Sequence, residues 1–196
     1  MSDILCVTNR KLCRDDFLFH IEEIAKAAPA GILLREKDLP EEEYKVLAEE
    51  VMAVCEKYQI PCILHSFTQV AVALKNPAIH LPLPLLRALT AEEKAKFSCI
   101  GASCHSIEEA KEAERLGCTY IIAGHIFATD CKKGVPPRGT EFLQEVCQAV
   151  TIPVFAIGGI SAENVDEVRM AGAAGACIMS GLMQCDKPEE YLKRFT

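Results

Sequence analysis

The chain has 196 residues, half of them apolar, and 28 acidic against 21 basic side chains give a formal net charge of −7. A net acidic surface argues against a nucleic acid or an anionic membrane as partner, because both require clustered positive charge. There is no apolar run of about eighteen residues and no linker-like segment, so we expect a single soluble, cytoplasmic domain over residues 1–196.

Eight short apolar segments are the predicted strands, and charge-rich segments separate them. They span Ile4–Asn9, Gly31–Lys37, Pro61–Ser66, Ala78–Pro82, Cys99–His105, Tyr120–His125, Pro153–Gly159 and Ala176–Gly181. Strands that are apolar on both faces and alternate with helices are typical of parallel βα units. Eight such units predict an α/β protein of the (β/α)8 TIM-barrel class, with a doubly wound open sheet as the alternative.

The clearest helical patterns span Glu41–Tyr58, Ser106–Gly117 and Ser161–Gly172. The last two begin at a serine that can cap a helix and end at a glycine that can terminate one. The segments after the third and fourth strands are weaker, since residues 67–76 are few and prolines interrupt residues 81–97.

The eleven cysteines are odd in number and none is spaced as C-x-x-C. Nothing in the sequence suggests secretion, so reduced thiols are expected rather than disulfides or a zinc site. No acidic cluster of the kind that binds a metal follows the predicted strands. The residues therefore predict no bound metal.

Active sites of TIM barrels lie at the C-terminal ends of the strands, where polar residues gather in this chain. They are Arg35, Lys37, His65, Ser66, Ser103, His105, His125, Gly158, Gly159, Ser180 and Gly181. Strand periodicity places Arg35 and Lys37 on one face of the second strand. It places His125 on the face of Ile121 and Ala123 in the sixth, and we expect both faces to point inward.

An arginine in a barrel mouth is costly to bury unless an anion meets it, so Arg35 indicates an anionic ligand. A structural pair with one of the many acids is the alternative. Gly159, Ser180 and Gly181 follow the seventh and eighth strands, where many barrels bind phosphate on backbone N–H groups. Paired glycines also occur in ordinary turns. Together these residues predict a phosphorylated small molecule as ligand.

His125 ends the sixth strand, and an imidazole exchanges protons near neutral pH. The loop after it carries Lys132, Lys133 and Arg138, whose charges can close over an anion. A packed histidine and a solvated loop are the alternative. His80 lies within a predicted strand, where a structural role is expected.

Three blocks of the sequence resemble the thiamine phosphate synthase superfamily. They are LLREK at residues 33–37, IGASCHSIEEAKEAERLGCTYIIAGHIFATDCKKG at residues 100–134, and IPVFAIGGISAENVDEVRMAGAAGACIMSG at residues 152–181. The resemblance implies a (β/α)8 barrel and two known activities. Synthases join a pyrimidine pyrophosphate to a thiazole phosphate with magnesium, whereas thiazole tautomerases move a proton to convert a carboxythiazole phosphate into its aromatic isomer.

The two branches differ at residues that bear on magnesium. A synthase is expected to have Asn-Asp after the third strand, where this chain has His65 and Ser66, and Gly-Gln-x-Asp after the fourth, where it has LPLPL. A hard cation that bridges a pyrophosphate needs such carboxylates. The loop GHIFATDCKK, with His125 in place of a proline and Cys131 in place of a threonine, is similar to the tautomerase form.

The resemblance therefore implies a thiazole tautomerase, with thiamine phosphate synthase or an inactive ligand-binding homologue as alternatives. It makes His125 the acid and base, and Gly159, Ser180 and Gly181 the phosphate ligands. The other implied substrate-binding residues are Arg35, Lys37, Ser103, Thr129 and Lys132, and at least one of the basic residues should meet the thiazole carboxylate. No cofactor is expected, unless the synthase alternative brings magnesium, and a homodimer stays open.

Overall fold

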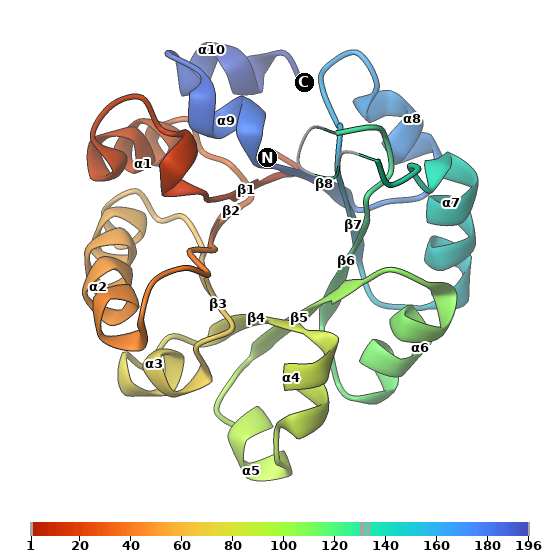
Figure 1. Cartoon of the computed structure of the whole chain (residues 1–196), viewed down its shortest axis with the longest axis horizontal. Helices are drawn as coiled ribbons and strands as arrows, with labels where there is room; N and C mark the ends of the chain where they lie inside the picture. Colours follow the sequence, from red (N-terminus) through yellow and green to blue (C-terminus); the bar gives the residue numbers. More distant parts are fainter. Residues whose placement is uncertain (1, 130–131, 133, 196) are drawn as a thin grey trace. The chain divides into compact units, whose positions relative to one another are not determined.

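The eight strands form a closed barrel in the order β1 to β8, with parallel pairing between neighbours. The structure is a computed structural model and describes residues 2–129, 132 and 134–195. The chain is traced in Figure 1 from β1 in red to α10 in blue. The predicted (β/α)8 TIM barrel is confirmed, and the open sheet is excluded.

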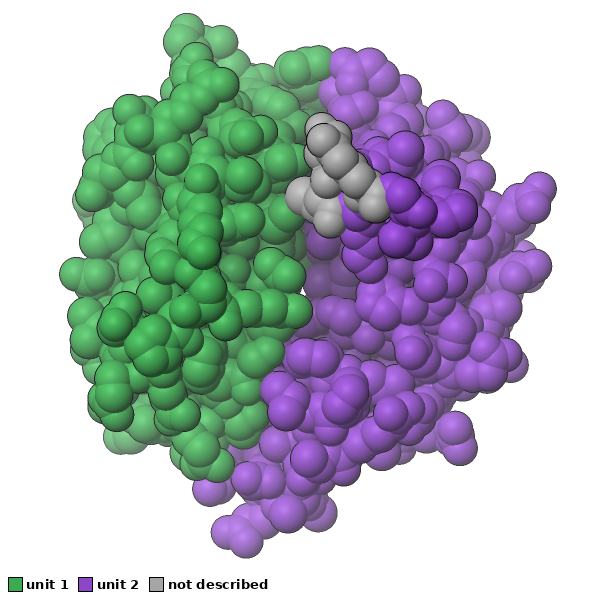
Figure 2. All heavy atoms as spheres, in the orientation of Figure 1, with its two compact units in different colours: residues 1–79, 178–196 green, residues 80–177 purple. Residues whose placement is uncertain are grey.

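The chain divides into two compact units, drawn in green and purple in Figure 2. Unit 1 comprises residues 1–79 and 178–196, and unit 2 comprises residues 80–177. The boundaries between the units fall within β4 and β8, and each unit is described below by itself.

Unit 1 contains the elements of the first three βα units and those at the C-terminus. They are β1 (Ile4–Val7), the 3₁₀ helix η1 (Arg10–Leu12), α1 (Phe17–Lys26), β2 (Gly31–Leu34), α2 (Glu41–Lys57), β3 (Cys62–His65), α3 (Thr68–Ala73), α9 (Ser180–Gln184) and α10 (Pro188–Lys193). Every residue of β1 and β2 is buried, as expected of strands that are apolar on both faces.

Unit 2 contains the middle of the chain. Its elements, together with the two strands at its boundaries, are β4 (Ala78–Pro82), α4 (Leu83–Ala88), α5 (Ala91–Lys94), β5 (Cys99–Cys104), α6 (Ile107–Arg115), β6 (Tyr120–Gly124), α7 (Gly139–Ala149), β7 (Val154–Ile157), α8 (Val165–Met170) and β8 (Gly175–Ile178). β6 pairs with β5 on one side and with β7 on the other.

The predicted helix boundaries are partly confirmed. Ser106 caps α6, accepting a hydrogen bond from the N–H of Glu109 (3.1 Å), and Gly117 ends it at a φ of 93°. The prediction that Ser161 caps the next helix is wrong. α8 begins only at Val165, because the side chain of Asn164 accepts from the N–H of Ser161 (2.9 Å) and holds the preceding turn.

The prolines after the fourth strand begin a helix. Pro82 is the N-cap of α4 and Pro84 lies in its first turn, where a missing N–H costs nothing. The helix ends at Ala88, and α5 starts after Thr90, which forms a capping box with Glu93.

All eight predicted strands are present, but most end earlier than predicted. β2 ends at Leu34, and its expected continuation to Lys37 is wrong, because the N–H of Arg35 donates to the hydroxyl of Thr8 (2.9 Å) and Lys37 is exposed. β6 ends at Gly124, one residue before His125. Several of the predicted polar residues, among them Arg35, His125 and Gly159, therefore lie in the loops that follow the strands. Others lie within elements: His65 is the last residue of β3, Ser103 lies in β5, and Ser180 and Gly181 begin α9.

Disulfides and membrane-spanning helices can be assessed for the described residues. The ten cysteines among them form no disulfide. None of the helices in the same part of the chain is both long and apolar enough to cross a membrane.

Candidate active site

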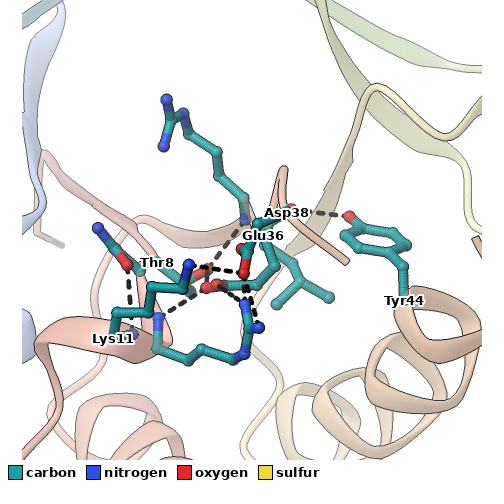
Figure 3. A network of polar contacts seen from close by, with 9 residues as sticks. Thr8, Lys11, Glu36, Asp38 and Tyr44 are labelled. Carbon is teal, nitrogen blue, oxygen red and sulfur yellow. Dashed lines mark hydrogen bonds and ion pairs between the residues drawn. The ribbon is translucent and has the colours of Figure 1, made fainter. Parts of the chain in front are cut away.

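A buried carboxylate organises the end of β2 in unit 1 (Figure 3). The side chain of Glu36 is 1% exposed. Its Oε1 accepts hydrogen bonds from the hydroxyl of Thr8 (2.7 Å) and the N–H of Arg10 (3.0 Å), and its Oε2 accepts from Arg10 Nη1 (3.1 Å). A buried charge is tolerated when it is paired and hydrogen-bonded in this way.

Arg10 also binds Asp38, which lies closer to solvent. Two parallel bonds join Arg10 Nη1 and Nη2 to the two carboxylate oxygens (both 2.8 Å), and Lys11 Nζ adds a contact of 2.9 Å. Hydrogen bonds from Arg10 and Lys11 hold the pKa of Asp38 well below its usual range, and the bonds to Asp38 raise the pKa of Arg10. The guanidinium of Arg10 therefore pairs with two acids at the same time.

Arg35 is half-buried beside this network, and its guanidinium pairs with no acid in the part of the chain that the structure describes. The structural Arg–Glu pair that the sequence left open exists here, but Arg10 forms it rather than Arg35. Lys37 is exposed. The roles of Arg35 and Lys37 in substrate binding stay predictions.

Tyr44 of α2 joins the ends of β2 and β3. Its hydroxyl donates to the carbonyl of Leu34 (2.7 Å) and accepts from the N–H of His65 (2.9 Å). Burial raises the pKa of Tyr44 well above its usual value, so the phenol keeps its proton. At the end of β3, the hydroxyl of Ser66 bonds to Nδ1 of His65 (2.7 Å).

In unit 2, a chain of three polar side chains links β4, β5 and β6. His80 Nε2 bonds to the hydroxyl of Ser103 (2.9 Å), and His80 Nδ1 bonds to the hydroxyl of Tyr120 (3.0 Å). A Cβ at Gly101 would overlap the ring of Tyr120. Gly101, a glycine inside β5, is therefore the feature of the sequence that could have indicated the close approach of Tyr120. The predicted role of Ser103 toward substrate stays a prediction.

His125 follows β6 and is 4% exposed. Its carbonyl accepts from the N–H of Arg138 (3.0 Å), and its ring Nε2 bonds to the carbonyl of Val135 (3.3 Å). A carbonyl can only accept, so Nε2 carries the proton of the neutral ring. Nδ1 is then the nitrogen that can take up a proton.

Two glycines of the β7 loop allow the loop after β6 to approach closely. Gly158 and Gly159 have φ values of 101° and 65°. A Cβ at Gly158 would overlap the Cβ of His125, and one at Gly159 would overlap the carbonyl oxygen of Ala128. The backbone of Phe127 donates to the carbonyl of Gly158 (3.0 Å). Close packing thus requires both glycines, whether or not Gly159 also meets a phosphate.

The remaining predicted residues lie in the β6 loop and at α9. The N–H of Lys132 donates to the carbonyl of Thr129 (3.1 Å), and Lys132 is exposed. Asp130, Cys131 and Lys133 of the same loop lie outside the described residues. Their neighbours Thr129 and Lys132 stay predicted substrate ligands.

Ser180 and Gly181 open α9, which belongs to unit 1, whereas Gly159 belongs to unit 2. A Cβ at Gly181 would overlap the hydroxyl of Tyr191. The ring of buried His20 donates from Nε2 to the carbonyl of Leu182 in α9 (2.7 Å). A joint phosphate site of Gly159, Ser180 and Gly181 stays a prediction.

The family model described as thiamine monophosphate synthase matches residues 4–182, which is most of the chain. The chain belongs to this family. Relatives with thiamine-phosphate synthase names share about a third of their residues with this chain, over nearly the full length of both proteins.

Three of these comparisons illustrate the similarity. The chain is 35% identical to "Thiamine-phosphate synthase" of Fusobacterium nucleatum, covering 98% of this chain and 96% of that protein. It is 32% identical to "Thiamine-phosphate synthase 2" of Streptococcus pneumoniae, covering 96% and 92%. The solved "Thiamine phosphate pyrophosphorylase from Pyrococcus furiosus" superimposes with a TM-score of 0.84 at 26% identity, covering 98% and 93%.

The names of these relatives favour the synthase alternative over the tautomerase, and none of them distinguishes a tautomerase branch. A synthase of this family is expected to hold magnesium, so the ligands that the chain offers bear on the choice. Among residues 2–129, 132 and 134–195, no group of three or more His, Cys, Asp and Glu side chains could hold a metal ion.

The strand ends themselves fit magnesium poorly. β3 ends at His65, whose ring bonds to the hydroxyl of the following Ser66, and β4 passes through Pro82 directly into α4. Neither end offers the carboxylate oxygens that magnesium requires. The carboxylates after β2 already bind Arg10. The described residues of this family member therefore do not fit a magnesium ion that bridges a pyrophosphate.

Proposed function

We propose that this member of the thiamine monophosphate synthase family is a thiazole tautomerase, which converts a carboxythiazole phosphate into its aromatic isomer. The observation that carries the proposal is the geometry of His125, a buried imidazole after β6 whose Nε2 faces a carbonyl. That partner makes Nδ1 the proton acceptor of the neutral ring.

In the proposed reaction a proton leaves a carbon of the non-aromatic ring for Nδ1 of His125. The electron pair of the broken C–H bond completes the aromatic ring, and a proton is added at the other end of the rearranged double bond. The substrate and its isomer therefore have the same composition. A general base of this kind contributes about 10²- to 10⁴-fold in rate.

The backbone around His125 suits this role. Its carbonyl is held by Arg138, and its Cβ lies against Gly158, so the imidazole is oriented before the substrate binds. A catalytic group that is already oriented loses little entropy in the transition state. The isomerisation uses no metal, in agreement with the ligands available after β3 and β4.

The charges of the substrate match the predicted binding residues. The proposal assigns the phosphate to Gly159, Ser180 and Gly181, as predicted from the sequence, and further contacts with the substrate to Ser103 and Thr129. It places the ring carboxylate on Arg35, whose guanidinium pairs with no described acid. Lys37 and Lys132 are both exposed and add positive charge to attract the anion.

Thiamine phosphate synthase is the second candidate, because the relatives carry that name at up to 35% identity. It would require magnesium at the ends of β3 and β4, which offer no carboxylate. An inactive ligand-binding homologue is the third.

Two assays on the purified protein separate the candidates. In the first, NMR in deuterated buffer follows the carboxythiazole phosphate, and we expect enzyme-dependent conversion to the aromatic isomer with incorporation of deuterium. In the second, a pyrimidine pyrophosphate and a thiazole phosphate are mixed with magnesium, and we expect no coupling. Coupling at about 1 s⁻¹ or faster, a rate typical of enzymes, would overturn the proposal in favour of the synthase. Binding without either reaction would favour the inactive homologue.

A further inference from the structure

We propose that Arg10 is a positioning residue that keeps Arg35 available to the carboxylate of the ligand, by holding the buried carboxylate of Glu36. This inference rests on the proposed function, in which Arg35 meets an anion. Arg10 itself is not expected to touch the substrate, because its two terminal nitrogens Nη1 and Nη2 are bound to the acids Glu36 and Asp38.

The first step is the proximity of Arg35 to the buried acid. The hydroxyl of Thr8 donates to Glu36 Oε1 (2.7 Å) and accepts from the backbone N–H of Arg35 (2.9 Å). The hydroxyl oxygen of Thr8 therefore binds both the carboxylate of Glu36 and the backbone of Arg35. The backbone nitrogen of Arg35 is therefore only two hydrogen bonds away from the carboxylate of Glu36.

The second step is the cost of an unpaired charge. The side chain of Glu36 is 1% exposed, whereas that of Arg10 is 28% exposed. Without the guanidinium of Arg10, Glu36 keeps only neutral donors, the hydroxyl of Thr8 and the backbone N–H of residue 10. A buried charge that has lost its counter-charge favours pairing with another cation. In the native protein Arg10 fills that role, and no described acid pairs with the guanidinium of Arg35.

The third step is the consequence for binding. Without Arg10, the guanidinium of Arg35 turns onto Glu36, and the ligand carboxylate loses its cation. Removing the charge of Glu36 as well leaves nothing to capture Arg35. The second substitution should therefore restore the binding that the first one weakens, whereas a purely structural role predicts that the two losses accumulate.

The experiment measures the affinity of the full-length protein for two probes by calorimetric titration. One is a thiazole phosphate that carries the ring carboxylate, and the other is the same thiazole phosphate without it. We expect Arg10→Met to weaken binding of the carboxylated probe about tenfold, which is about 1.4 kcal/mol. Binding of the second probe should change by less than about twofold, because it makes no contact with Arg35.

The Arg10→Met/Glu36→Gln double variant should bind the carboxylated probe within about threefold of the wild type. The matched control is Arg87→Met. Arg87 forms an equally well-aligned pair with Glu112 (both bonds 2.7 Å), and both side chains are partly exposed on α4 and α6. This control should leave both affinities unchanged.

Two results would overturn the proposal: a wild-type affinity in Arg10→Met, or a double variant that binds as weakly as Arg10→Met while its circular dichroism is native. If Arg10→Met does not fold, Arg10→Lys replaces it. Lysine keeps the charge but cannot bind two acids with parallel bonds. The Arg10→Lys substitution should lower the affinity for the carboxylated probe about threefold, and Arg10→Lys/Glu36→Gln should restore it. An unchanged affinity in Arg10→Lys overturns the proposal equally.

Failure of the proposed function gives a different pattern. If the wild type binds neither thiazole phosphate, the tautomerase proposal fails, and inorganic pyrophosphate becomes the probe for the same variants. Weaker binding in Arg10→Met and recovery in the double variant then support the role of Arg10 by itself. Equal affinities in all variants contradict it.

Discussion

The ends of β2 and of β6 are positioned by different means. After β2, the buried carboxylate of Glu36 is held by the hydroxyl of Thr8 and by both the backbone and the side chain of Arg10. After β6, the carbonyl of His125 is held by a backbone N–H, and its Cβ lies against a glycine of the β7 loop.

The two strand ends therefore tolerate different substitutions. A side-chain network depends on charges and hydroxyl groups, so it is sensitive to substitutions that keep shape but remove a hydrogen bond. A loop that packs on glycine depends on the absence of a Cβ, so it is sensitive to added volume and tolerant of a changed ring. The expected effects are largest at the strand ends and smallest at a surface contact away from both.

The largest effect is expected from His125→Asn. The substitution removes the base but keeps the backbone contacts, so the rate of isomerisation should fall about 10²- to 10⁴-fold, with little change in thermal unfolding. NMR-monitored turnover and the unfolding midpoint check this. An affinity for inorganic phosphate equal to the wild type's should accompany the loss. A near-normal rate would remove His125 from the mechanism.

The next effect is that of Gly158→Ala, which should lower the free energy of unfolding by about 2–4 kcal/mol, as measured in urea. Its φ of 101° disfavours alanine, and the new Cβ would overlap that of His125. Gly117→Ala is the matched control. Gly117 has a φ of 93° but nothing within 4 Å of an added Cβ, so only about 1–2 kcal/mol should be lost. Equal losses would show that backbone strain alone matters at Gly158.

A smaller effect is expected from Thr8→Val at the end of β2. Valine has the shape of threonine but leaves Glu36 and the N–H of Arg35 each without one hydrogen bond, which should cost about 1–3 kcal/mol of unfolding free energy. Thr8→Ser, which keeps the hydroxyl, should recover most of it. If serine and valine are equally destabilising, packing of the methyl group explains the loss, and the contrast between the two strand ends fails.

The smallest effect is expected at the surface of unit 1. Hydrogen bonds from Lys57 and Tyr58 lower the pKa of Glu22 to about 2, from a usual value of 4.5. Because the folded pKa lies below the unfolded one, this contact stabilises the fold above about pH 4.5, and the contribution disappears as the pH falls toward 2. Thermal unfolding of Glu22→Gln should therefore differ from that of the wild type near pH 6 and converge with it near pH 2. A difference that persists at pH 2 would point to packing instead.

Local sequence patterns predicted the strands well. The eight apolar segments correspond to the eight strands, and the cap at Ser106 is where serine and glutamate spacing placed it. The cap at Ser161 was wrong, because a side-chain bond from Asn164 delays the start of α8. Periodicity also extended β2 too far, since it does not show that the N–H of Arg35 bonds to a side chain.

The candidate site was less predictable. His125 and the glycines after β7 stood out by their position after strands, but the reason for Gly158, which is contact with His125, was not visible in the chain. The pair of Glu36 and Arg10 could not be predicted, because the two residues are 26 positions apart in the chain. The chain of hydrogen bonds through His80 was missed for the same reason, since Ser103 and Tyr120 come from other strands.

The alternation of strands and helices can be read from the sequence, because burial of apolar side chains and helix capping act over a few neighbouring residues. The absence of carboxylates after β3 and β4 can also be read there. The pairing of acids with bases, and the protonated nitrogen of the His125 ring, follow instead from tertiary contacts. Those outcomes depend on hydrogen-bond partners from distant segments that come within about 3 Å of each other. The spacing of two residues along the chain does not show whether they come this close.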